Sequence, residues 1–101
     1  MIEREAAVTH HWRVRVRERL GPDVDAEALA NAIVWEIDHD TGHVDYLGRV
    51  SRCGKRAYRF KFSETICGAA ILVLGESRVN FITLFEPGWR LTREGKASRK
   101  V

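Results

Sequence analysis

The spacing of the apolar residues changes its period in the middle of this chain, close to Gly42. Before Gly42, apolar side chains recur every three or four residues, as they do along the buried face of a helix. After Gly42 they alternate with polar side chains, which is typical of a strand with one exposed face. Because the two patterns occupy separate halves, the sequence predicts helices first and a sheet second.

Two helices are predicted in the first half. The first covers residues 6–20 and ends at Gly21, which is followed by proline in a helix-stop signature. Its apolar residues recur every four positions: Val8, Trp12, Val16 and Leu20. The second helix begins with Asp23 or Asp25 as its N-cap, is rich in Ala, Leu and Glu, and ends near His39.

Four strands are predicted in the second half, at residues 44–50, 58–62, 66–75 and 79–86. The third is apolar on both faces, which indicates a central strand, although a buried helix has the same pattern. Helices that precede an antiparallel sheet make an α+β fold. We therefore expect two N-terminal helices packed on a four-stranded antiparallel meander sheet, in two layers. The predicted domain covers residues 1–92, and residues 93–101 are predicted to be a basic, flexible tail.

Length and composition limit the class of protein. A chain of 101 residues that is 45% hydrophobic and 31% charged is typical of one folded, soluble domain. No apolar run reaches the ~20 residues that cross a bilayer, and the N-terminus has no apolar signal core, so we expect a cytoplasmic protein without a membrane partner. Cys53 and Cys67 are too few for a disulfide framework or a zinc set. We expect no cofactor and no metal.

Charge is distributed unevenly along the chain. Residues 23–45 contain seven acids and no Lys or Arg, whereas residues 46–62 contain six Lys or Arg and no acid. Cations in such a segment can neutralise phosphates, and Tyr46 or Tyr58 can stack on a base. The predicted nucleic-acid or partner-binding residues are Arg49, Arg52, Lys55, Arg56, Tyr58, Arg59 and Lys61. Alternatively, these charges are solvated or paired with the acidic segment, and protect an edge strand from aggregation.

The acidic segment is a second candidate surface. Glu27, Glu36 and Asp40 are predicted to bind a partner by imitating the phosphates of a nucleic acid, and the alternative is an ordinary solvated helix face. A short, Arg-rich chain with segregated charge is similar in style to small proteins encoded by prophages, some of which are anti-CRISPR inhibitors. This similarity implies stoichiometric binding to a host defence protein.

The histidines do not match a known catalytic or metal motif. His10 and His11 are adjacent, so on a helix their side chains point about 100° apart. The stretch "DHDTGHVD" places His39 and His43 among acids but lacks the spacing of a calcium loop, and we interpret it as a polar loop. No glycine-rich phosphate loop or nucleophile elbow is present in the sequence.

The order of the predicted elements resembles that of the RelE/barnase-like nuclease superfamily. The resemblance covers residues 9–86 and rests on two helices followed by a four-stranded antiparallel sheet, with basic residues on the first helix and the early strands. It implies RNA cleavage by dispersed His, Arg, Lys and hydroxyl side chains, and an antitoxin as a partner. The matching catalytic candidates are His11, Arg15, Arg49, Arg59 and Thr83.

The sequence favours binding over catalysis. We expect a non-enzymatic, phage- or prophage-type accessory protein that binds nucleic acid or a nucleoprotein complex through the basic segment, as a monomer or a homodimer. An anti-defence inhibitor of the anti-CRISPR kind is one form that such a protein takes. The alternative is a RelE-like endoribonuclease toxin.

Overall fold

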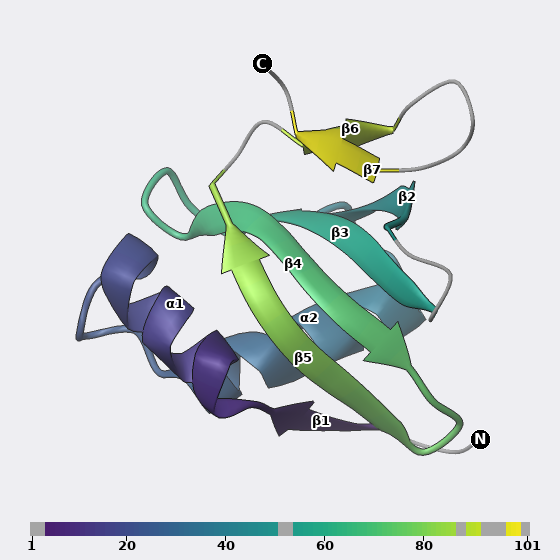
Figure 1. Ribbon diagram of the computed structural model, residues 1–101, viewed down its shortest axis with the longest axis horizontal. Coiled ribbons are helices and arrows are strands. Elements are labelled where there is room, and N and C mark those ends of the chain that lie inside the picture. Colours follow the sequence, from purple (N-terminus) through teal and green to yellow (C-terminus); the bar gives the residue numbers. More distant parts are fainter. Residues whose placement is uncertain (1–3, 51–53, 87–88, 92–96, 100–101) are drawn as a thin grey trace.

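Two helices and a mixed five-stranded sheet make up the main body of the protein. A computed structural model describes residues 4–50, 54–86, 89–91 and 97–99. The elements are β1 (Glu5–Val8), α1 (His10–Leu20), α2 (Ala26–His39), β2 (Val44–Arg49), β3 (Lys55–Lys61), β4 (Cys67–Leu74) and β5 (Arg78–Phe85). The strand order is β1-β5-β4-β3-β2, and both helices pack on one face of the sheet (Figure 1). The predicted α+β class is therefore confirmed.

Strand β1 is the main departure from the predicted four-stranded antiparallel sheet. It pairs with β5 in parallel, so the sheet has five strands and is mixed. The helix predicted over residues 6–20 begins only at His10, because residues 6–8 belong to β1. Thr9 separates the two elements: its side chain accepts a hydrogen bond from the Trp12 N–H and its hydroxyl donates to the Phe81 carbonyl.

The ends of α2 agree more closely with the sequence. Asp25 is the N-cap, and its carboxylate accepts hydrogen bonds from the backbone N–H groups of Glu27 and Ala28. The helix ends at His39, as predicted, and Asp40 follows in the left-handed conformation with φ 52°. Among the described residues, no helix is long and apolar enough to cross a membrane.

A second, two-stranded sheet follows the main one. Strand β6 (Trp89–Leu91) pairs with β7 (Ala97–Arg99) in antiparallel, and the hairpin lies beside β2 (Figure 1). Within the predicted tail of residues 93–101, the structure therefore places Ala97–Arg99 in a strand. Residues 93–96 and 100–101 lie outside the described part of the chain.

The larger hydrophobic core lies between the helices and the sheet and centres on Trp12. This side chain is fully buried, and its indole N–H donates a 3.0 Å hydrogen bond to the carbonyl of Ala26 at the start of α2. Its ring centroid is 4.9 Å from that of Phe81 on β5. Trp12 thus joins α1, α2 and the sheet. A smaller cluster occupies the opposite face of the sheet and contains Leu47, Ala57, Ala69 and Ile71.

We expect Trp12→Ala to lower the free energy of unfolding by about 3–5 kcal/mol, because it removes a fully buried ring and its hydrogen bond. Trp12→Phe keeps most of the buried area, so its loss should be smaller. Equilibrium urea denaturation measures both. The matched control is Trp35→Ala at a half-exposed position, which should change stability by less than about 0.5 kcal/mol. Equal losses at the two tryptophans would contradict this description of the core.

Candidate functional site

The β2–β3 hairpin distributes the predicted cations over both faces of the sheet. Alternation along β3 places Arg56 on the helix side with Phe60, which is in the main core, and places Lys55, Arg59 and Lys61 on the other side with Ala57. Arg49 pairs directly with Arg56 across the two strands. Arg52 lies outside the described residues. The predicted cations therefore do not form one continuous surface.

Two of the cations on the far side have acidic partners. Arg59 donates to Asp45 of β2 at 2.9 Å, and the ammonium of Lys61 is 3.1 Å from the Glu64 carboxylate. All four side chains are more than half exposed, and exposed ion pairs of this kind contribute only about 0–1 kcal/mol to stability. The pairs nevertheless balance the charge of Arg59 and Lys61 locally, so the self-paired alternative holds for these two residues.

The cations on the helix side are arranged differently. Within the described residues, neither Arg49 nor Arg56 forms an ion pair with a carboxylate. The Arg56 guanidinium donates a 2.9 Å hydrogen bond to the Tyr46 hydroxyl and lies 5.8 Å from the centre of that ring. Like charges that face each other across two strands destabilise the pair. In the part of the chain that the structure describes, the hairpin thus holds two arginines without a carboxylate partner, one of them beside an aromatic ring.

Tyr46 is the exposed ring of this region, and Tyr58 supports it. The Tyr46 side chain is 48% exposed, whereas Tyr58 is half-buried against the core. Their ring centroids are 5.1 Å apart. Burial, with a smaller contribution from Tyr46, raises the pKa of Tyr58, which therefore keeps its proton at neutral pH. The sequence offers either Tyr46 or Tyr58 as a stacking ring, with Tyr58 among the predicted contact residues; of the two, Tyr46 is the ring that is more exposed to solvent.

The predicted acidic face of α2 is not assembled. Glu27 and Glu36 are nine residues apart, about two and a half turns, so they lie on opposite sides of the helix. Glu27 forms an ion pair with Arg13 of α1, and Asp40 is the C-cap. Glu36 is buried, with 7% of its side chain exposed, and is unavailable to a partner. The spacing Leu29, Ile33, Glu36 already placed it in the buried stripe.

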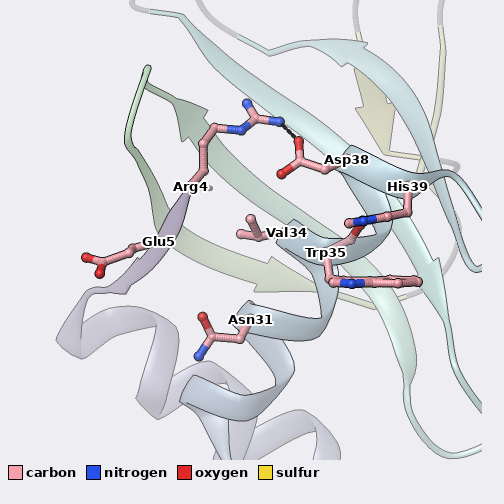
Figure 2. Close-up of a pocket in the computed structure, with 7 residues that line it drawn as sticks. All are labelled: Arg4, Glu5, Asn31, Val34, Trp35, Asp38 and His39. Carbon is pink, nitrogen blue, oxygen red and sulfur yellow. Dashed lines mark hydrogen bonds and ion pairs between the residues drawn. The ribbon is translucent and has the colours of Figure 1, made fainter. Parts of the chain in front are cut away.

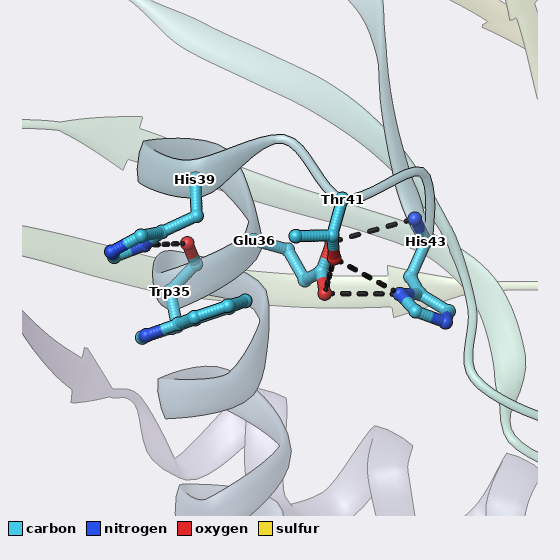
Figure 3. Close-up of polar contacts among 5 residues, drawn as sticks. All are labelled: Trp35, Glu36, His39, Thr41 and His43. Atoms are coloured by element: carbon cyan, nitrogen blue, oxygen red, sulfur yellow. Dashed lines mark hydrogen bonds and ion pairs between the residues drawn. The ribbon is translucent and has the colours of Figure 1, made fainter.

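Glu36 instead joins the end of α2 to the start of β2 (Figure 3). Its carboxylate accepts a 2.5 Å hydrogen bond from the Thr41 hydroxyl, a 3.0 Å bond from Nδ1 of His43 and a 3.4 Å bond from the His43 backbone N–H. The Thr41 hydrogen bond is the largest cause of a lowered pKa for Glu36; burial opposes it, and the bonds from His43 add to it. Glu36 therefore stays ionised and holds His43 in one orientation.

His43 borders a hollow on the sheet. The side chain is half-exposed, and because Nδ1 donates to Glu36, the Nε2 atom is the nitrogen left to accept a proton. The hollow has a volume of about 420 Å³, and its polar lining residues are His43, Asp45, Arg59, Lys61, Glu64 and Cys67. His39, in contrast, stacks on Trp35 away from His43 (Figure 3). The described residues contain no cluster of three potential metal ligands.

The catalytic candidates taken from the nuclease resemblance do not come together as one set: Arg15 donates a hydrogen bond to His11 on α1, away from Arg59 and Thr83. His11 and Arg15 belong to α1, which covers the helix side, and Arg15 pairs with Glu18. Arg59 and Thr83 lie on the other face of the sheet. A β-bulge causes this placement of Thr83: Ile71 pairs with Thr83 but Leu72 pairs with Phe81, so the residue between them is extra and the strand changes its alternation.

Comparison with known proteins finds no significant match to this chain. No protein-family model matches the chain, and no curated protein or solved structure is significantly similar to it. The resemblance to RelE/barnase-like nucleases and the similarity in style to prophage proteins stay predictions.

We expect Glu36→Gln to remove an acid-sensitive part of the stability. Because the pKa of Glu36 is lowered from 4.5 in the folded protein, the carboxylate stabilises the fold fully above that ordinary value. This contribution is lost as the pH falls through the lowered pKa. The Tm of the variant should therefore lie below that of wild type at neutral pH, and the difference should shrink in acid.

Thermal unfolding followed by circular dichroism between about pH 7 and pH 3 measures this difference. Glu27→Gln is the matched control, since Glu27 is on the same helix but exposed. Its Tm should run parallel to that of wild type. A Tm difference for Glu36→Gln that stays constant through the acid range would show that the carboxylate charge is not the stabilising feature.

Proposed function

We propose that this chain is a non-enzymatic binding protein that engages nucleic acid, alone or within a nucleoprotein complex. The contact region is the Tyr46 surface, which we define as Tyr46, Arg49 and Arg56 on the helix side of the β2–β3 hairpin. The observation that carries the proposal is the cross-strand pair of Arg49 and Arg56, without a carboxylate partner in the described residues, beside a half-exposed tyrosine.

A phosphate group would relieve the electrostatic cost of this arrangement. Two guanidinium groups that face each other across the strands repel, and an anion placed between them converts the repulsion into two attractions. Guanidinium groups also bind phosphate oxygens through two parallel hydrogen bonds. Lys55 and Arg52 continue the basic character toward the tip of the hairpin in the sequence.

The aromatic ring favours single-stranded nucleic acid over a duplex. Tyr46 is held by the hydrogen bond from Arg56 and by contact with Tyr58, so it is ordered before a ligand arrives. An ordered, exposed ring can stack on an unpaired base, and such stacking contributes about 1–3 kcal/mol per base. In a duplex the base faces are covered by their neighbours. A single-stranded RNA or DNA segment therefore fits the Tyr46 surface best.

The Tyr46 surface also suits a small protein that binds to the nucleic acid within a nucleoprotein complex. A phage or prophage accessory protein, including an anti-defence inhibitor of the anti-CRISPR kind, would act by covering a nucleic acid that a host defence protein holds. In that setting the chain needs no turnover and binds stoichiometrically. The competing ligand of the Tyr46 surface is an acidic protein segment without nucleic acid. Salt-dependent binding of the protein to isolated oligonucleotides distinguishes a nucleic-acid ligand from a protein ligand.

We expect Arg49→Ala and Arg56→Ala each to weaken binding to a single-stranded oligonucleotide and to reduce the slope of log K against log salt by about 0.7, the value for one lost phosphate contact. The double change to Glu should abolish binding. Tyr46→Ala should cost about 1–3 kcal/mol with little change in the slope. Fluorescence anisotropy over a series of salt concentrations measures all three.

The matched control is the double variant Arg59→Glu with Lys61→Glu, which carries the same charge change on the same strand but on the opposite face. Its oligonucleotide affinity should fall far less than that of the Arg49 and Arg56 double variant. Equal losses in the two double variants would contradict the assignment to the Tyr46 surface. Unchanged binding in the Arg49 and Arg56 double variant would do the same.

RNA cleavage is the second candidate function, and one observation favours it. The buried Glu36 orients His43, and His43 lines the same hollow as Arg59 and Lys61. In this candidate reaction, Nε2 of His43 accepts the proton of an RNA 2′-hydroxyl as that oxygen attacks the adjacent phosphorus. The departing 5′-oxygen takes a proton from water, and the two cations stabilise the charge on the phosphate.

For this second candidate we expect wild type to cleave single-stranded RNA in the presence of EDTA and to leave 2′,3′-cyclic phosphate ends, which mass spectrometry identifies. His43→Ala should lower the rate by at least about 100-fold, the usual contribution of a general base. His39→Ala is the control with an intact Glu36–His43 pair. Absence of cleavage by wild type, or equal rates for the two histidine variants, would rule this function out.

A further inference from the structure

The second exposed aromatic ring of the described residues is Trp35, on the outer side of α2. Its side chain is 51% exposed, in contrast to the fully buried Trp12. Its ring stacks on that of His39 with a centroid distance of 4.0 Å and an interplanar angle of 10°. Nδ1 of His39 donates a 2.8 Å hydrogen bond to the Trp35 carbonyl, which fixes the imidazole. The two rings therefore form an ordered aromatic pair at the surface.

A hollow of about 330 Å³ opens beside this pair. Figure 2 shows Val34 in the middle of the lining residues, Arg4 reaching across to Asp38, and Trp35 with His39 on the side opposite Arg4. The volume is at the small end of ligand sites, which suits one inserted side chain better than a cofactor. The hollow is thus a candidate for docking one residue of a partner.

The charges around the hollow select a cation. Among the described residues, Arg4 is the single Lys or Arg that lines it, and its guanidinium is already paired with Oδ1 of Asp38. Oδ2 of Asp38 accepts no hydrogen bond from a described residue, and a carboxylate has room for further donors. Glu5 adds a carboxylate at the rim, pointing away from Trp35 (Figure 2). Asp38 also belongs to residues 23–45, which contain seven acids and no Lys or Arg.

We propose that this hollow docks an arginine side chain of a basic protein segment. The guanidinium donates to Oδ2 of Asp38, and its planar face lies against the Trp35–His39 pair. Arginine fits better than lysine because its flat cation stacks on aromatic rings and bonds a carboxylate through a fork of N–H groups. The aliphatic stem packs on Val34. Tryptophan and arginine are also the residues most often dominant in protein interfaces.

A nucleic acid is a poor occupant of the same hollow, because its phosphates would meet Asp38 and Glu5. A second copy of this chain could supply an arginine, but that contact would join unlike surfaces and would lead to open chains of molecules unless the rotation closed a ring. The proposal therefore commits to a different protein. It does not depend on the Tyr46 surface, which carries the opposite charge.

The test is a titration of ¹⁵N-labelled protein with a capped peptide of alternating Arg and Gly, followed by NMR. The indole N–H signal of Trp35 is assigned by its loss in Trp35→Ala. We expect saturable chemical-shift changes at Trp35 and His39 with the Arg peptide. A peptide in which Lys replaces Arg should cause smaller changes, and one in which neutral citrulline replaces Arg should cause none. Trp35→Ala and Asp38→Asn should each weaken binding by at least about fivefold.

The matched controls are Tyr46→Ala, at the other exposed ring, and Glu27→Gln, at another acid of the same helix; both should bind the Arg peptide as wild type does. Asp38→Asn also loses its pair with Arg4, so the Tm of each variant is measured, and Trp35→Ala decides the result if Asp38→Asn is unfolded. Equal shifts with the citrulline peptide, or unchanged Arg-peptide affinity in Trp35→Ala, would overturn the proposal.

Two further outcomes would assign the hollow to another occupant and also overturn the proposal. The first is a single-stranded oligonucleotide that shifts the Trp35 signal when the Arg peptide does not. The second is self-association of wild type in sedimentation experiments that Trp35→Ala abolishes. Wild type that stays monomeric and shows Arg-specific chemical-shift changes at Trp35 supports the proposal.

Discussion

The indole of Trp12 is the point at which the two layers of this protein meet. Helix α1 is short, and only Trp12 and Val16 of its residues are buried, so its attachment depends on few side chains. The ring packs on Phe81 of β5, and its N–H bonds the first carbonyl of α2. Because β1 leads through Thr9 directly into α1, the position of the edge strand also depends on this contact.

With the layers held in this way, the acidic and basic segments do not simply pair with each other. Glu27 and Asp38 of the acidic segment form ion pairs with arginines from the N-terminal part of the chain, Arg13 and Arg4. Asp45 is the member of that segment that pairs with the hairpin, through Arg59. This distribution leaves Arg49 and Arg56 without carboxylates in the described residues. The uneven charge of the sequence therefore survives as a smaller, local imbalance on one face.

The two exposed aromatic rings lie in surroundings of opposite charge. Tyr46 stands beside two arginines, and Trp35 stands beside Asp38 and an acidic stretch of chain. If both proposals hold, one surface takes a single-stranded nucleic acid and the other takes an arginine of a basic protein. Those are the two components of a nucleoprotein, so a single small domain could contact both at once. In these two proposals, the arginines beside Tyr46 and the excess of carboxylates beside Trp35 make the two surfaces select ligands of opposite charge.

The sequence also contained the signal for the buried carboxylate, but its interpretation was wrong. The sequence prediction places Glu36 on an exposed acidic face because the acids cluster along the chain, but they do not cluster around the helix. The position of Glu36 three residues after Ile33 and seven after Leu29 places it inward. A buried carboxylate needs hydrogen-bond donors, and Thr41 and His43, which follow the helix, supply them. The polar loop predicted around His43 is therefore also a structural joint.

Local patterns by themselves determined much of this fold: the two helices, the strands of the second half, the Asp25 cap and the α+β class all follow from periodicity and capping chemistry. Strand β1 could not be predicted, because Glu-Ala-Ala-Val is too short to show a period and its parallel pairing with β5 is a contact between distant parts of the chain. The division of the hairpin cations by face follows from strand alternation. Which of those cations finds a carboxylate was decided only by tertiary structure, since an ion pair requires two side chains to approach in space and not in sequence.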